Sequence, residues 1–299
     1  MVGLLLALIS SFLFALSNVY IRQGVFRSGE SFSPIPISGL CGVVIFGVPL
    51  FISGEFRELT SFSSLALISI AGAGIVHFVF GRVLAYAGVR LIGANRATTV
   101  LNSNILIAAL SGIILFNEPL TAFLVLGFVF ITSGVLIICS SIYSSAKGGS
   151  SAAVSPMKGI FVSLGGAFCW GISPMLIKIG FTEGVSTLSS IFVSYVAASI
   201  VVAFLMFHRG NVEKMRRLDR SSLLSIVKGS VAVAIAQLFR YFAFEYSPIS
   251  LVAPVAGTSP LFVLPLSFMI NRSIEAFGIR IIAGTIATVI GVFLIFWVV

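Results

Sequence analysis

Apolar residues run along the chain in long stretches, without the frequent polar positions that a soluble surface requires. Gly, Pro, Ser or charged residues separate one stretch from the next, and each is near the roughly 20 residues that a bilayer-crossing helix needs. This pattern predicts ten membrane-spanning helices, at residues 2–21, 34–53, 62–87, 94–115, 120–142, 159–178, 187–207, 222–245, 249–270 and 276–298. The first run lacks a basic leader and a small-residue cleavage site, so we expect it to be retained as a helix.

Composition supports a membrane protein. Hydrophobic residues make up 58% of the chain and charged residues 9%, against roughly 25% charged in a soluble domain, which excludes a soluble enzyme. The net charge of +9 would suggest a nucleic-acid partner in a soluble protein, but in a membrane protein basic loops set the orientation. No nucleic-acid partner is predicted. The three cysteines lie in apolar runs without a partner motif, so no metal and no cofactor are predicted.

The chain is predicted to contain two related halves. Residues 144–158 form a linker rich in Ser, Gly and Ala between a first five-helix unit at 1–143 and a second at 159–299. An offset of about 156 residues pairs 3–24 with 159–180, and one of about 157 pairs Glu118 with Glu275, together with glycines that follow each. Because each unit has an odd number of crossings, the second must enter from the opposite face. The predicted fold is therefore all-α, with ten transmembrane helices as two inverted five-helix repeats.

Basic residues are unevenly distributed over the loops, which supports the inverted arrangement. The loops after the first, third, fifth, seventh and ninth runs hold Arg22, Arg27, Arg90, Arg96, Lys147, Lys158, Arg209, Lys214, Arg216, Arg217, Arg220, Arg272 and Arg280. The alternate loops hold Arg57 and Lys178. By the positive-inside rule the basic face is cytoplasmic, which predicts a multi-pass protein of the inner cell membrane with both termini outside.

The sequence resembles a known family at this point. The stretch GANRATTVLNSNILIAALSGIILFNEPLTAFLVLGFVFITSGV (93–135) is similar to the signature of the EamA family in the drug/metabolite transporter superfamily, with Glu118 at the family's acidic turn. Residues 248–295 are similar but depart from the pattern around Asn271-Arg272-Ser273. The resemblance implies a secondary transporter, commonly an exporter of metabolites or drugs. It also implies a central cavity built by the first, third and fourth helices and their repeat partners.

Polar residues in the third and eighth predicted spans are candidates for function, because hydrocarbon penalises them. In the third span, Arg82 and Tyr86 are four residues apart and share a face, while His77 is predicted about 140° around the helix from Arg82. His77 is a candidate for substrate binding or for carrying a coupling proton; the alternative is a packed histidine bonded to a neighbour. The eighth span carries Gln237, Tyr241 and Glu245 on one stripe, with Arg240 beside it.

We hypothesise that Arg82 and Arg240 attract a carboxylate or another anionic group and form charged gates at opposite mouths of one cavity. The alternative is that each reaches the nearer interface or pairs within the bundle, for example Arg240 with Glu245. Glu245, at the end of its span, is the second candidate for proton coupling.

The remaining candidates are amides, an aromatic residue and a proline. Asn102 and Asn104 could bind substrate or link helices. Asn18 and Pro174 correspond under the offset of 156, and a proline interrupts the hydrogen bonds of its helix, as at many transporter sites near the membrane midplane. Trp170 lies one turn from Pro174 and could stack on a planar substrate. Simple curvature of the helices and ordinary packing are the alternative interpretations.

The functional prediction is a transporter, not an enzyme. It is expected to move a small polar or amphipathic metabolite, such as an amino acid or organic acid, by alternating access, and the resemblance favours export. An exporter of hydrophobic or cationic drugs is the alternative and would need an acidic cavity residue. An intramembrane lipid-modifying enzyme is more remote, because two histidines and no buried acid pair offer little catalytic chemistry. The partners predicted are the small-molecule substrate, the lipid bilayer and a coupling proton, while the residues leave the oligomeric state open.

Overall fold

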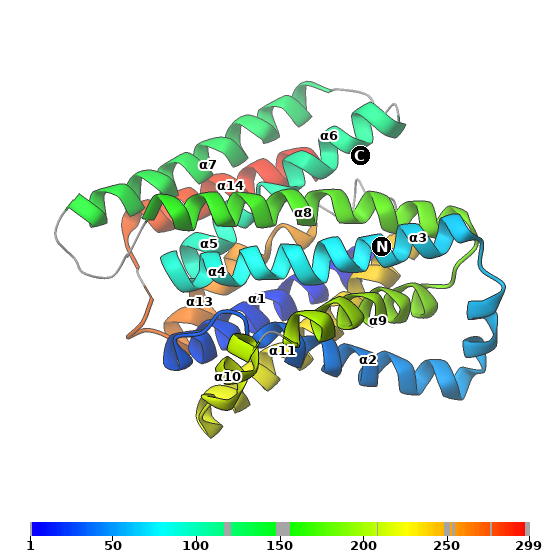
Figure 1. Cartoon of the computed structure of the whole chain (residues 1–299). Helices are drawn as coiled ribbons and strands as arrows, with labels where there is room; N and C mark the ends of the chain where they lie inside the picture. Colours follow the sequence, from blue (N-terminus) through cyan, green and yellow to red (C-terminus); the bar gives the residue numbers. More distant parts are fainter. Residues whose placement is uncertain are drawn as a thin grey trace.

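The computed structural model describes residues 2–116, 121–147, 156–207, 209–247, 252, 255–275 and 277–296. Throughout these residues the regular structure is helical. Figure 1 shows the longer helices lying side by side in one bundle. The helices are α1 (Val2–Ser28), α2 (Pro34–Ser53), η1 (Glu55–Thr60), α3 (Ser64–Gly74), η2 (Ile75–Gly81), α4 (Arg82–Ile92), α5 (Ala94–Leu101), α6 (Asn104–Phe116), α7 (Ala122–Lys147), α8 (Pro156–Thr182), α9 (Thr187–Met206), α10 (Arg209–Arg216), α11 (Arg220–Tyr246), α13 (Ser259–Ile270) and α14 (Ile279–Phe296).

Six helices among the described residues are long and apolar enough to cross a membrane. They are Val2–Ser28, Pro34–Ser53, Ser64–Ile92, Met157–Thr182, Thr187–Met206 and Arg220–Tyr246. Shorter apolar helices cover Val125–Ser140, Ser259–Ile270 and Ile279–Leu294. An all-helical membrane protein is therefore confirmed, while ten crossings arranged as an inverted repeat stay a prediction. Most of the predicted linker, residues 148–155, lies outside the described residues, as does Glu118.

Polar caps mark where several of these helices begin. Ser63 and Ser186 accept backbone hydrogen bonds at the starts of α3 and α9, and Asp219 does so at the start of α11. Each side chain satisfies amide groups that have no partner within the first helical turn. Hydrogen bonding from Ser222 lowers the pKa of the Asp219 carboxyl below its ordinary value.

Close helix pairs depend on small residues. α1 and α11 run antiparallel, since Gly3 faces Ser247 at one end and Gly24 faces the Ser222 carbonyl at the other. α7 and α14 lie along each other at one edge of the bundle (Figure 1), where a Cβ on Gly291 would lie 2.6 Å from the Gly127 oxygen. Glycine at such positions lets two backbones approach within a membrane.

The third predicted span contains a π-helix that the apolar pattern did not indicate. α3, η2 and α4 form one continuous span from Ser64 to Ile92, and η2 is its π-helical part. A π-helix bonds residues five apart, so side chains with that spacing come close to one face. His77 and Arg82 both line the cavity described below, although their hydrogen-bond partners lie on different helices, so the predicted angle between them stays a prediction.

The fourth predicted span, expected as one helix over 94–115, is instead divided. α5 ends at Leu101 and α6 begins at Asn104, with a turn at 102–103. The Ser103 hydroxyl donates to the Val100 carbonyl (2.8 Å), and short polar side chains of this kind compete with helical backbone bonds. A second turn, at 257–258, precedes α13, and the Asn102 side-chain amide donates to the Gly257 carbonyl. The two interrupted segments are thus joined inside the bundle.

One helix falls in a segment that was expected to be a basic loop. α10 includes Lys214 and Arg216 and follows α9 directly. It packs against α9.

Candidate functional site

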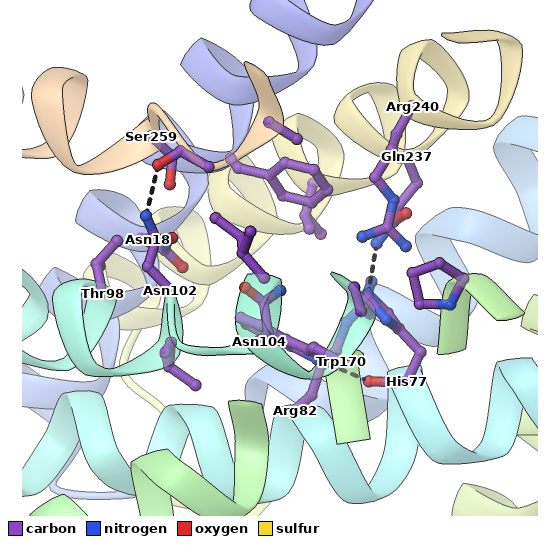
Figure 2. Close-up of a pocket in the computed structure, with 18 of the residues that line it drawn as sticks. Asn18, His77, Arg82, Thr98, Asn102, Asn104, Trp170, Gln237, Arg240 and Ser259 are labelled. Atoms are coloured by element: carbon purple, nitrogen blue, oxygen red, sulfur yellow. Dashed lines mark hydrogen bonds between the residues drawn. The ribbon is translucent and has the colours of Figure 1, made fainter. Parts of the chain in front are cut away.

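A cavity with an empty volume of about 900 Å³, counting its open mouth, lies within the helical bundle. It gathers ten of the eleven residues predicted to bind a substrate: Asn18, His77, Arg82, Tyr86, Asn102, Asn104, Trp170, Pro174, Gln237 and Arg240. Figure 2 labels eight of these side chains, which come from helices that are far apart in sequence.

His77 lies at the centre of a small polar and aromatic cluster. Its Nε2 is 2.8 Å from the Gln237 amide nitrogen, the contact drawn as a dashed line in Figure 2. The indole ring of Trp170 stacks on the imidazole, with centroids 5.5 Å apart, and its Nε1 donates to the His77 carbonyl (3.2 Å). His77 Nδ1 and Gln237 Oε1 are buried without a hydrogen-bond partner. The cluster is therefore held by its own hydrogen bonds and ring stacking, while His77 Nδ1 and Gln237 Oε1 remain without hydrogen-bond partners.

Arg82 is held firmly by the protein itself. One of its Nη atoms donates to the Ser38 hydroxyl (2.6 Å) and the other to the Tyr195 hydroxyl (2.9 Å). Its guanidinium also lies over the Phe78 ring, 4.6 Å from the centroid, and the residue is 2% exposed. A guanidinium bound in this way joins α4 to α2 and α9.

Arg240 is buried but poorly satisfied. Its Nε and Nη2 atoms have no hydrogen-bond partner, although only 7% of the residue is exposed. The guanidinium lies between the rings of Phe14 and Phe244, 5.6 and 5.7 Å from their centroids. It does not pair with Glu245, whose carboxylate accepts a hydrogen bond from Thr187 Oγ1 (2.8 Å). Two guanidinium donors buried without a hydrogen-bond partner are costly.

Two predicted residues on α11 lie away from the cavity lining. Tyr241 is buried beside Phe181, and its hydroxyl contacts the Ser194 hydroxyl at 3.4 Å. Glu245 is on the exposed end of α11. The stripe expected on this helix therefore divides, with Gln237 and Arg240 facing the cavity and the other two facing α9 and α8.

Sequence reasoning missed several residues of the lining. Phe14, Thr98, Phe244 and Ser259 also face the cavity. Helical spacing could have found three of them, because Phe14 lies four residues before Asn18, Thr98 four before Asn102, and Phe244 four after Arg240. Only contacts across the bundle identify Ser259.

The charge of the cavity is one-sided. Its described lining contains two arginines, four amide side chains and no acidic residue. The positive potential of such a site favours ligands that carry a negative group and disfavours cations. No three His, Cys, Asp or Glu side chains of the described residues come together in a group that could hold a metal ion, so we assign none to the site.

The apolar helices and the family match described next support a multi-pass membrane protein with a polar cavity in its interior. The chain belongs to the EamA-like transporter family, whose model matches residues 1–140 and again residues 157–297. The resemblance drawn from residues 93–135 and 248–295 is confirmed by this match.

A protein of known crystal structure has a similar fold. It aligns with a TM-score of 0.66 over 96% of this chain and 94% of its own, at 15% identity. At this low identity, the likeness shows a shared fold and carries no information about function. No curated protein sequence matches the chain.

Proposed function

We propose that the protein is a secondary transporter that carries a small amphipathic metabolite with an anionic group, of the amino-acid or organic-acid type, by alternating access. The observation that carries this proposal is the buried guanidinium of Arg240, which faces the cavity with Nε and Nη2 unpartnered. A carboxylate can accept two parallel hydrogen bonds from a guanidinium. Because Nε and Nη2 have almost no accessible surface as they lie, the Arg240 side chain must turn toward the cavity to make both bonds.

The rest of the lining matches the remainder of such a ligand. Asn18, Asn102 and Asn104 offer amide donors and acceptors, and Gln237 Oε1 and His77 Nδ1 lack partners. Leu101, Ile105, Val233 and the aromatic rings give the cavity an apolar portion. A cationic drug would find no acidic residue among the described lining residues, so this cavity disfavours the drug-export alternative.

The transport architecture belongs to the same proposal. Ten crossings in two inverted five-helix units, at 1–143 and 159–299 around the linker at 144–158, would give the cavity two exits related by symmetry. The two regions matched by the family model support this division. We also propose export across the inner membrane, with the basic loops in the cytoplasm and His77 as the site of a coupling proton.

A ligand screen by thermal unfolding tests this proposal. The purified full-length protein in detergent would be heated with amino acids and with mono- and dicarboxylic acids, each beside its uncharged amide, and with cationic drugs. We expect carboxylates to raise the unfolding temperature and their amides to do so far less, with the difference lost in Arg240→Gln. Arg217→Gln removes an exposed arginine, whose side chain is 72% accessible, and should respond as the wild type does. Stabilisation by cationic drugs alone, unchanged in Arg240→Gln, would overturn the proposal.

A further inference from the structure

A buried ion pair closes the bundle just beyond the cavity. Arg22 on α1 meets Glu275, in the turn between α13 and α14, with Nε 2.9 Å from Oε1. The two side chains are 10% and 1% exposed. By contrast, the ion pair of Arg217 with Glu213 is longer at 3.7 Å and lies in solvent. The Arg22–Glu275 pair is therefore a short ion pair in the interior of the bundle.

Each partner of the pair also binds the end of another helix. Arg22 Nη1 donates to the carbonyls of Val89 (3.0 Å) and Arg90 (3.2 Å), in the last turn of α4. The Glu275 carboxylate accepts the backbone amides of Ala94 (2.8 Å) and Asn95 (3.2 Å), in the first turn of α5. Helix ends carry carbonyl or amide groups without intrahelical partners, with partial charges that suit a cation and an anion respectively. One ion pair thus holds four separate segments of the chain together.

Glycine allows this close approach. Gly93, between α4 and α5, has a φ of +86°, and a Cβ there would lie 2.9 Å from Glu275 Oε2. A side chain at this position would push the carboxylate away from the start of α5. Asn271 adds a further tie, because its side-chain amide donates to the Val19 carbonyl at 2.7 Å.

The network lies about one helical turn beyond the cavity on three helices at once. Arg22 follows the lining residue Asn18 by four positions on α1, which corresponds to about 6 Å. Val89 and Arg90 follow Tyr86 on α4 by a similar step, and Ala94 precedes Thr98 on α5. At the other end the lining extends to Phe244, near the end of α11. The ion pair therefore lies beyond the end of the cavity lining that is nearer to the basic loops.

We propose that Arg22 and Glu275 form a latch that keeps the cavity closed on the basic face of the protein and must separate for the cavity to open there. The proposal rests on the alternating-access part of the proposed function. Opening on this face requires α1 to move away from the ends of α4 and α5, and each of these contacts resists that movement. Removing either charge leaves the other buried without its counter-ion, bonded to backbone groups and, for Glu275, near the charge of Arg96, which weakens the closed arrangement. Variants of the latch should therefore shift the protein toward the state that opens on the basic face.

The test measures access to the cavity and needs no substrate. Thr98→Cys places a thiol in the lining next to the latch, in a protein whose three native cysteines are changed to alanine. A charged, membrane-impermeant methanethiosulfonate is added to right-side-out and to inverted membrane vesicles, and the rate of modification is compared. With the latch intact we expect slow modification from the basic face. Glu275→Gln should raise that rate at least fivefold and lower the rate from the opposite face.

Two further variants make the result decisive. Arg22→Lys keeps the positive charge but cannot donate to Glu275 and to the ends of α4 together, so it should raise the rate in the same direction. It provides the test if Glu275→Gln fails to fold. Arg217→Gln breaks the exposed ion pair and should leave both rates unchanged. Unchanged rates in both latch variants would overturn the latch while leaving transport intact. Equal modification from both faces with the latch intact would instead contradict alternating access itself.

Discussion

Arg82 and Arg240 line the same cavity, but only Arg82 has its guanidinium bound by the protein, through Ser38 and Tyr195. Arg240 lies between two aromatic rings, and its Nε and Nη2 atoms have no partner. We hypothesised charged gates formed by two equivalent arginines. The two arginines differ in their partners, because the guanidinium of Arg82 joins helices while that of Arg240 keeps two atoms unbonded. For this reason we propose Arg240 as the arginine that binds the ligand, and the gate hypothesis stays a prediction.

Tyr195→Phe should destabilise the protein, because it leaves Arg82 Nη2 buried without its hydroxyl partner. The expected loss is about 1–3 kcal/mol in the free energy of unfolding, the usual penalty for a buried polar group without a partner. Chemical unfolding in detergent measures it. Tyr246→Phe is the matched control, since Tyr246 is 61% exposed and should unfold like the wild type. Equal stability of Tyr195→Phe and the control would contradict the structural role of Arg82.

Arg240→Met should separate stability from ligand binding. Methionine is apolar, unbranched and shorter, so it removes an unsatisfied buried cation and should preserve stability or raise it by about 1 kcal/mol. Affinity for carboxylate ligands should fall at least tenfold. Thermal unfolding without ligand and titration with the best ligand of the screen give the two values. A loss of stability as large as that of Arg82→Met would show that Arg240 also has a structural role.

Trp170 should report ligand binding through its fluorescence. Its indole stacks on His77 and lines the cavity, so a bound ligand changes its surroundings. The sequence contains two tryptophans, and Trp297→Phe leaves Trp170 as the single emitter. We expect a saturable change in emission with a stabilising carboxylate. The change must vanish when Trp170→Phe is added, and a signal that persists would place its origin elsewhere.

Much of the fold could be predicted, because a helix that crosses the hydrocarbon core of a membrane needs about 20 apolar residues in a row. Runs of this length can be read directly from the sequence. The same rule identified the cavity residues, since polar side chains such as Asn18 and Gln237 are retained in a span only where they find polar surroundings. The π-helix around His77 and the turn at 102–103 escaped this reasoning, because an apolar run shows neither a change of helical pitch nor a local break. The Arg22–Glu275 pair joins residues 253 positions apart. No local pattern specifies such a contact.

Gly291→Ala should weaken the contact between α7 and α14. A Cβ on Gly291 would lie 2.6 Å from the Gly127 oxygen and 2.7 Å from the Ile131 nitrogen, and backbone atoms cannot move aside easily. Overpacking of this kind costs about 1–3 kcal/mol, measurable as a lower unfolding temperature. Gly278→Ala is the matched control, because a Cβ at Gly278 meets nothing within 4 Å. Equal effects at both positions would show that the glycine contact is not what holds the pair together.

Transport in proteoliposomes tests the central claim most directly. The carboxylate ligand that stabilises the protein best would be loaded inside the vesicles, and uptake of its radiolabelled form by exchange would be followed for the wild type, Arg240→Gln and Arg217→Gln. The account predicts exchange by the wild type and by Arg217→Gln, and a rate close to that of protein-free vesicles for Arg240→Gln. Exchange by Arg240→Gln at the wild-type rate and affinity would contradict it.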